Sequence, residues 1–317
     1  MMDNDAFAGT GQDRDYSGGV SLTVGGNRSN GPSNIFGDAL DGLDQISGAE
    51  QWYARKTTSR FQRVFQIGMN LFTPENKSAS LPIREDRPYA NLVYLASSRY
   101  APTQNGRHFY QSSLVVGLLG TNVGEFLQDT VHEVTGSEKP KGFENQISDG
   151  IELTGRYAVS RHTLLISATH LELNLIASAS LGYLTEGSAG LSIRIGHIPK
   201  PGWPSISDYT HFGSQPLPIA RPGARINRTG ERYWSIGFGT RFRAYNAFLQ
   251  GQVRDSHVRY SSSQLNRLLF DAWIGYTTEM GEYRLNYSVR YQSAEISHGP
   301  SARDLIWASI SLARNPQ

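Results

Sequence analysis

The chain repeats one strand pattern, in which large apolar side chains occupy one alternate set of positions and small or polar side chains occupy the other. Residues 283–292 show it most clearly, because five apolar or aromatic residues alternate there with a set that contains two arginines. Alternate side chains of a β-strand face opposite sides. A soluble sandwich does not usually place arginines behind so complete an apolar stripe, whereas a barrel in a bilayer does, because lipid lies outside it and polar groups lie inside. The two sets are Tyr283, Leu285, Tyr287, Val289, Tyr291 and Arg284, Asn286, Ser288, Arg290, Gln292.

The same alternation recurs in four other segments, at 190–196, 233–244, 268–277 and 306–312. We predict that their apolar sets face lipid and that the opposite sets face the interior. The alternative is a large soluble antiparallel sheet, because the signal of each barrel segment is weak by itself. The residues predicted to face lipid include Leu191, Ile193, Ile195, Trp234, Ile236, Phe238, Leu268, Phe270, Ile274, Ile306 and Ile310, and those predicted to face inward include Arg194, Arg241 and Arg243.

The pattern predicts eleven strands. They are expected at 15–26, 60–72, 88–101, 108–119, 147–159, 163–184, 187–198, 232–245, 264–279, 281–293 and 303–314. Glycines mark tight connections at Gly106, at Gly281 and between Gly187 and Gly190. Residues 199–231 contain six prolines and are expected to form an irregular loop.

An odd number of strands conflicts with the even counts of bacterial single-chain barrels, because an open edge leaves unpaired backbone groups in lipid. We therefore expect a twelfth strand at the start of the chain, nearly absent or irregularly paired within residues 1–12. The predicted fold is all-β: an antiparallel transmembrane β-barrel of about twelve strands, forming one domain over 1–317. A short helix is predicted at 122–135, where apolar residues have helical spacing.

Composition excludes several other classes of protein. No apolar run approaches the roughly 18 residues that suggest a membrane-spanning helix. A net charge of +2 offers no argument for nucleic-acid binding, and the absence of cysteine is compatible with an exported bacterial protein. The polar start Met1-Met2-Asp3-Asn4-Asp5 shows no signal peptide, which for an exported barrel indicates a processed, engineered or truncated form.

Strand direction groups several polar residues at one end of the predicted barrel. When strands are counted back from residue 317 with the C-terminus periplasmic, the stretches 4–14, 73–87 and 120–146 fall at the outer end. The candidate residues in these stretches are Asn4, Asp5, Lys77, Gln128, His132 and Glu138.

These residue types suggest hydrolytic chemistry, although each also has an ordinary structural interpretation. Asn4 and Asp5 offer the hard oxygen ligands that Ca²⁺ prefers, or they form a turn by accepting local backbone hydrogen bonds; Ser17 has the same ambiguity. His132 shares a helix face with Gln128 and could act as general base toward water. It could equally be a histidine without a role.

Two further candidates lie in loops. Glu138 could orient the imidazole or be an ordinary loop charge. Lys77 could hold a phosphate or stabilise an oxyanion, or be a solvated lysine. No Gly-x-Ser-x-Gly elbow, cysteine nucleophile or His-Glu-x-x-His zinc motif is present.

Several segments in the first half of the chain, taken in order, resemble the outer-membrane lipid A deacylase (LpxR) family. They are Asn4-Asp5, residues 13–19 (DRDYSGG), residues 72–77 (FTPENK), residues 86–90 (DRPYA), residues 128–132 (QDTVH) and residues 141–146 (KGFENQ). The second half is similar only as barrel strands.

The resemblance implies a twelve-stranded barrel of the bacterial outer membrane, with a site at its outer rim. It implies removal of the 3′-O-linked acyloxyacyl chain of lipid A, in which a histidine activates water and Ca²⁺ stabilises the oxyanion. It assigns the base to His132 and its support to Glu138. The resemblance also implies that Lys77 and Gln128 belong to the site. It implies that Asn4, Asp5 and, less directly, Ser17 lie near the metal. The alternative function is that of a non-enzymatic outer-membrane barrel, such as a narrow channel, an adhesin or a structural protein.

Overall fold

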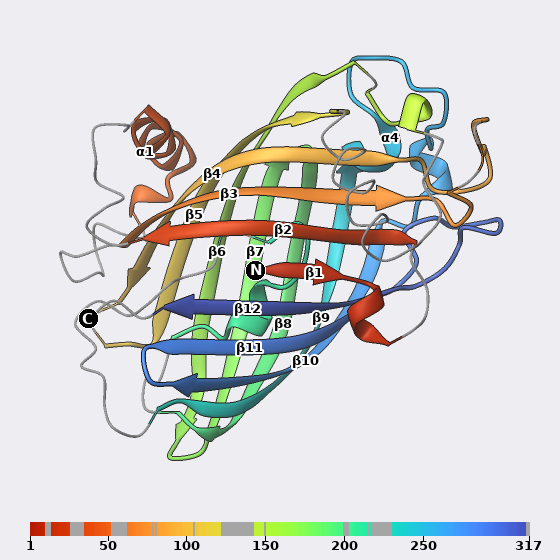
Figure 1. The fold of residues 1–317 in the computed structure, drawn as a ribbon. Helices are drawn as coiled ribbons and strands as arrows, with labels where there is room; N and C mark the ends of the chain where they lie inside the picture. Colours follow the sequence, from red (N-terminus) through yellow and green to blue (C-terminus); the bar gives the residue numbers. More distant parts are fainter. Residues whose placement is uncertain are drawn as a thin grey trace.

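The structure, a computed structural model, forms a closed barrel of antiparallel strands (Figure 1). It describes residues 1–9, 14–25, 35–51, 62–77, 79, 81–103, 105–121, 143–148, 150–198, 203–214, 216 and 230–314. Within these residues there are twelve strands: β1 (Met2–Asn4), β2 (Asp15–Gly25), β3 (Gln62–Thr73), β4 (Ala90–Pro102), β5 (His108–Leu119), β6 (Glu152–Ala168), β7 (Leu171–Gly182), β8 (Leu184–His197), β9 (Arg232–Asn246), β10 (Leu268–Met280), β11 (Tyr283–Gln292) and β12 (Leu305–Arg314).

Short helices lie in the connections between strands. They are η1 (Ala6–Ala8), α1 (Ile35–Ser47), η3 (Phe143–Asn145), η4 (Ile206–Tyr209), α4 (Ala247–Gln250) and η5 (Ser262–Gln264). None of the helices in the described part of the chain is long and apolar enough to cross a membrane. The helix predicted at 122–135 lies outside the described residues.

The alternating pattern produces the two faces that it predicts. Trp234, Ile236 and Phe238 on β9 are exposed on the outside of the barrel, at 53%, 43% and 57% of their surface. Arg241 and Arg243 on the same strand are buried in the interior. Because side chains alternate along the strand, a filled polar interior and an apolar exterior follow from one sequence pattern. The predicted barrel is confirmed.

β1 is the expected short first strand, and it closes the ring. Met2 and Asp3 pair with Ile310 and Ser309 of β12 on one side, and with Val20 and Gly19 of β2 on the other. A Cβ at Gly18 would lie 2.6 Å from the carbonyl oxygen of Asp3, so a glycine lets β1 approach β2 this closely. Three residues are therefore enough to join the two edges.

Two predicted boundaries are wrong. β6 continues to Ala168 and turns at residues 169–170, so 163–184 is not a single strand. The next turn lies at Tyr183, and the predicted connection between Gly187 and Gly190 is the interior of β8. A Cβ at Gly190 would lie 2.7 Å from the carbonyl oxygen of Phe238, so this glycine permits close strand packing and is not a turn residue.

The described part of the proline-rich segment enters the barrel. Residues 203–214 bury Trp203, Ile206 and Phe212 in the interior. The indole of Trp307 on β12 donates to the carbonyl of Thr210 at 2.9 Å, and Asn70 on β3 donates to the carbonyl of Phe212 at 3.2 Å. The predicted irregular loop is therefore, over these residues, an internal plug.

Aromatic rings fill the barrel between the plug and the end that carries α4. Phe212 of the plug lies 5.1 Å from Phe72 and 5.9 Å from Trp307, and Phe72 lies 4.6 Å from Phe248 of α4, measured between ring centroids. Tyr16 completes the cluster. This packing fixes the strand ends and α4, from which the loops at this end of the barrel extend.

Candidate active-site rim

The topology brings the matched segments to one end of the barrel. The connections 5–14, 74–89 and 120–151 all join strands at the end that carries α4, as the count of strand directions predicts (Figure 1). We call this end the rim. Asn4, Asp5, Ser17 and Lys77 are described there. The other candidates, Gln128, His132 and Glu138, lie outside the described residues.

Asn4 and Asp5 form a capped turn at the end of β1. The backbone N–H of Ala6 donates to Asn4 Oδ1 at 2.7 Å and to Asp5 Oδ1 at 2.8 Å. The N–H of Arg14 donates to Asp5 Oδ2 at 2.6 Å, which closes the stretch 5–14. The turn-forming alternative is therefore realised for both residues.

Ser17 adjoins this turn. The side-chain amide of Asn4 donates to the carbonyl of Ser17 at 2.8 Å, and the Ser17 hydroxyl bonds that of Thr73 on β3. Lys77 follows β3 on the same rim, and its carbonyl accepts a hydrogen bond from Tyr89 at 3.0 Å. The structure thus joins Asn4, Asp5 and Ser17 into one unit and connects the Lys77 segment to the start of β4.

The donor set of this unit fits a hard cation in part. Asn4 and Asp5 present side-chain oxygens at one turn, and the carboxylate of the buried Asp5 accepts the backbone N–H groups of Ala6 and Arg14. Across the described ranges, no three His, Cys, Asp or Glu side chains gather as a metal site would require. The turn therefore offers a partial set of ligands that water would complete.

Asn91 ties together the two ends of the segment that contains Gln128, His132 and Glu138. Its amide group donates to the carbonyl of Thr121 at 2.7 Å and to Gln146 Oε1 at 2.6 Å, and its oxygen accepts from the N–H of Thr121 at 3.1 Å and from its hydroxyl at 2.6 Å. Asn91 is fully buried. Sequence reasoning missed this residue, although it directly follows the matched segment 86–90.

A junction of ion pairs joins three more rim segments. Arg303, between β11 and β12, donates to Asp15 at 2.7 Å and to Asp86 at 2.7 Å. Arg87 contacts the other Asp15 oxygen at 3.3 Å. Asp15 has a left-handed backbone, with φ of 66°, which is strained for a residue other than glycine and is held in place by both arginines. The matched segments 13–19 and 86–90 therefore meet at this junction.

The junction continues into the barrel. Arg87 pairs with the buried Glu295, which also pairs with Arg243 of β9. Burial alone would raise the pKa of Glu295, but Arg87 and Arg243 outweigh it and lower the pKa. Glu295 is therefore ionised and stabilised by two guanidinium groups, as a buried carboxylate requires.

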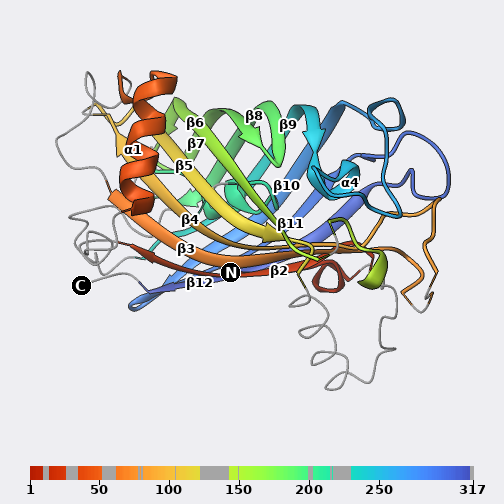
Figure 2. The same ribbon diagram turned by 90° about the horizontal axis from the view of Figure 1, so that it is seen from above.

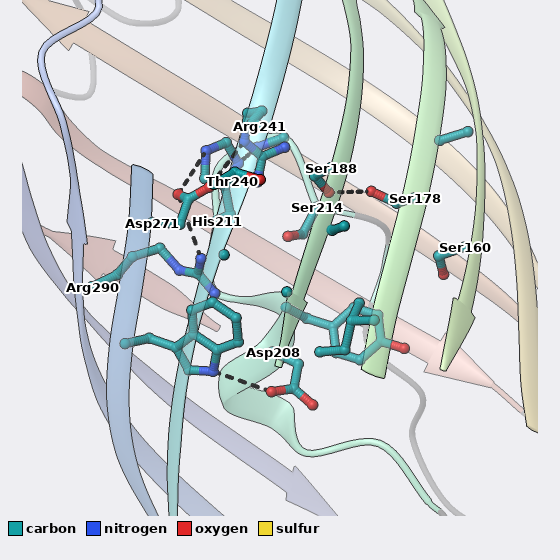
Figure 3. A pocket seen from close by; sticks show the side chains of 18 of the residues that line it. Ser160, Ser178, Ser188, Asp208, His211, Ser214, Thr240, Arg241, Asp271 and Arg290 are labelled. Carbon is teal, nitrogen blue, oxygen red and sulfur yellow. Dashed lines mark hydrogen bonds and ion pairs between the residues drawn. The ribbon is translucent and has the colours of Figure 1, made fainter. Parts of the chain in front are cut away.

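A polar cavity of about 70 Å³ lies deeper, between the plug and β6–β11 (Figure 3). Its lining groups bind one another: Asp271 pairs with Arg241 and Arg290, and the Ser178 and Ser188 hydroxyls are 2.7 Å apart. The indole of Trp273 donates to Asp208 of the plug at 3.1 Å. These contacts account for packing of the plug and lie apart from the matched segments.

The closed ring with an apolar exterior, a packed polar interior and motifs gathered on one rim defines a transmembrane β-barrel whose loops carry the candidate site. The model of the family described as outer membrane protein LpxR matches residues 1–315, and the chain belongs to this family. Among solved structures, LpxR from Salmonella typhimurium matches with a TM-score of 0.71 and 15% identity, covering 99% of this chain and 98% of that one, which supports the same fold. No curated protein sequence matches the chain.

Proposed function

We propose that this chain is a calcium-dependent esterase that removes the 3′-O-linked acyloxyacyl chain of lipid A in the outer leaflet of the outer membrane. Membership of the LpxR family supports the substrate class. The observation that carries the proposal is the convergence on one rim of segments distant in sequence. The Asn4–Asp5 turn, the Asp15–Arg87–Arg303 junction with its further ion pair to Glu75, and the Asn91 anchor together hold every matched segment that the structure describes.

In the proposed reaction, His132 takes a proton from a water molecule, and the water oxygen attacks the carbonyl carbon of the ester. The ester C–O bond then breaks, the acyloxyacyl chain leaves as a carboxylic acid, and the sugar oxygen takes the proton from His132 to become a hydroxyl. Glu138 orients the imidazole of His132. Gln128 and Lys77 contact the substrate, and the cationic Lys77 suits a lipid A phosphate or the developing oxyanion.

Asn4 and Asp5, with Ser17 beside them, are the residues we propose to hold Ca²⁺, because the turn they form brings hard oxygen donors together at the rim. When bound, the ion supplies positive charge that stabilises an oxyanion. The filled interior also favours a scaffold for an enzyme over a narrow channel: the plug and the aromatic cluster occupy the barrel across the described residues.

Mass spectrometry of lipid A tests the proposal. Cells that express the chain should yield lipid A lighter by the 3′-O-linked acyloxyacyl group, and cells that express the Asp5→Ala variant should not. Membranes treated with a calcium chelator should lose the activity and regain it when Ca²⁺ is added. Unmodified lipid A from cells with a folded, membrane-inserted parent would contradict the esterase, whereas full activity in excess chelator would contradict only the role of calcium.

A further inference from the structure

α1 lies outside the barrel, at the end opposite the rim. Figures 1 and 2 show it across the outer surface of the wall, near β4 and β5. The wall residues that it contacts point outward, because their neighbours along each strand point inward. Arg99 on β4, for example, is flanked by Tyr100, which bonds the carbonyl of Pro216 inside the barrel. Arg63, Ser112 and Tyr157 point outward in the same way.

The face of α1 that touches the wall combines charged groups with the fully buried side chain of Leu40. Asp44 is fully buried and bonds Ser112 at 2.9 Å, Tyr157 at 2.8 Å and Arg99 at 3.3 Å. Asp41 pairs with both Arg63 and Arg99. Charged and hydroxyl groups, together with Leu40, thus join helix and wall, and α1 covers two arginines on the outer surface of the barrel.

The faces of α1 turned away from the wall are divided into an apolar arc and a polar flank. At 100° per residue, Ile35, Ala39 and Ile46 fall together, opposite Asp44, and they are exposed; Ile35 and Ile46 are exposed at 83% and 86%. Phe36 and Leu43 border this arc on one side. Asp38 and Gln45, both exposed, border it on the other.

The apolar arc is continuous with the lipid-facing surface of the barrel. Phe36 packs edge-on against Phe65 of β3, with ring centroids 6.4 Å apart, and Phe65 and Ile67 are outward-facing and exposed. The side of α1 that carries Phe36 is thus directed toward the apolar band. The side that carries Asp38 and Gln45 is directed away from it. A helix at a boundary between lipid and water has its apolar side toward the lipid and its polar side toward the water, and α1 is oriented in this way.

We propose that α1 is an interfacial helix that binds the phospholipid surface of the leaflet opposite the rim, with Ile35 and Ile46 among the acyl chains and Gln45 in the water. The occupant is lipid, because the exposed arc extends the barrel's own lipid-facing surface. The helix also shields Arg63 and Arg99 from that surface. This inference does not rest on the proposed enzyme activity.

The absence of cysteine makes a direct test possible, because any introduced cysteine carries the only label. We suggest spin labels at Ile35→Cys, Ile46→Cys and Gln45→Cys in the full chain, reconstituted in vesicles of phosphatidylcholine and phosphatidylglycerol. Collision with oxygen reports lipid, and collision with a water-soluble nickel chelate reports water. Ile236→Cys on the lipid face of β9 and Val253→Cys, exposed at 92% in a rim loop, are the two references.

Labels at Ile35 and Ile46 are expected to collide with oxygen as the Ile236 label does, and the Gln45 label to collide with the nickel chelate as the Val253 label does. The helix is not interfacial if labels at Ile35 and Ile46 match the Val253 reference. Protection of these labels from both reagents would overturn the proposal as well, because it would indicate a protein partner or a second copy of the chain. Heat-modifiable migration on gels checks that each variant is folded.

Discussion

The two ends of the barrel use the same chemistry for different purposes. At the rim, Asp15 is held between Arg87 and Arg303, and the cluster joins parts of the chain nearly 300 residues apart on the inside and mouth of the barrel. At the opposite end, Asp44 is held by Arg99, Ser112 and Tyr157, and the cluster attaches a single helix to the outer wall. The role of a buried carboxylate–arginine cluster therefore depends on the segments that it joins: segments of the mouth of the barrel at the rim, and a helix and the outer wall at the other end.

The largest expected effect is at the rim, on His132. A positioned general base contributes about 10²–10⁴-fold, so His132→Ala should lower lipid A deacylation by roughly that factor while the barrel still inserts. Only the neutral imidazole can accept a proton, so activity should fall as the pH is lowered through about 6.5, where an unperturbed histidine titrates. His170→Ala, at the turn between β6 and β7 at the other end, is the control. Parent-level activity of a folded His132→Ala protein would remove the catalytic assignment.

Next is the rim junction itself. Arg87→Ala leaves Asp15 and Glu295 each with one guanidinium fewer in a buried site, and losing one partner of a buried pair costs roughly 3–5 kcal/mol. The free energy of unfolding in urea should fall by about that amount. Arg314→Ala, at the opposite end, removes an exposed ion pair to Glu282 and should cost no more than about 1 kcal/mol. Equal losses for both variants would show that the junction is not a special feature of the rim.

A smaller effect on stability is expected at Asn91, with a distinct effect on activity. Asn91→Ala leaves buried partners at Thr121 and Gln146 unsatisfied, a cost of about 1–3 kcal/mol. Asn91 is bonded to both ends of the segment 122–142, so its loss should also position that segment less well for the reaction. If the whole free-energy cost is added to the activation barrier, kcat should fall about tenfold or more, since each 1.4 kcal/mol is roughly tenfold in rate.

The matched control for Asn91 is Asn286→Ala. Asn286 is another fully buried amide, and it bonds Ser207 of the plug at 3.0 Å and Thr277 at 3.0 Å. Its loss should cost similar stability and leave kcat unchanged at temperatures where the protein is folded. A fall in kcat for Asn286→Ala equal to that for Asn91→Ala would mean that activity follows stability alone.

The smallest effect is expected at the α1 end. Asp41→Ala removes a carboxylate that is about one-third exposed, and such pairs contribute about 0.2–1 kcal/mol. Deacylation should be unchanged, because the contacts of α1 with the described residues lie on the outer wall, at the end opposite the rim. A marked loss of deacylation activity in this variant, with the barrel folded, would show that the two ends are coupled.

The sequence predicted the parts of the structure that depend on local periodicity. Alternation along 283–292 and 233–244 determined which side chains face lipid, since neighbouring residues of a strand must face opposite sides. It also determined which end holds the connections 5–14, 74–89 and 120–151, because strand direction alternates. It failed at Gly187 and Gly190, where glycine permits close packing of two strands and so resembles a turn.

Only the tertiary structure decided what lies inside the barrel and outside its wall. Residues 203–214 carry no periodic signal, and their entry as a plug depends on partners such as Asn70 and Trp307, far away in sequence. Asn91 and Arg303 acquire their roles from residues 30 or more positions distant. Asp41 and Asp44 of α1 are placed against the wall by arginines that are distant in sequence. Local pattern determines which way a side chain points. Which group it meets there depends on how the closed ring brings distant segments together.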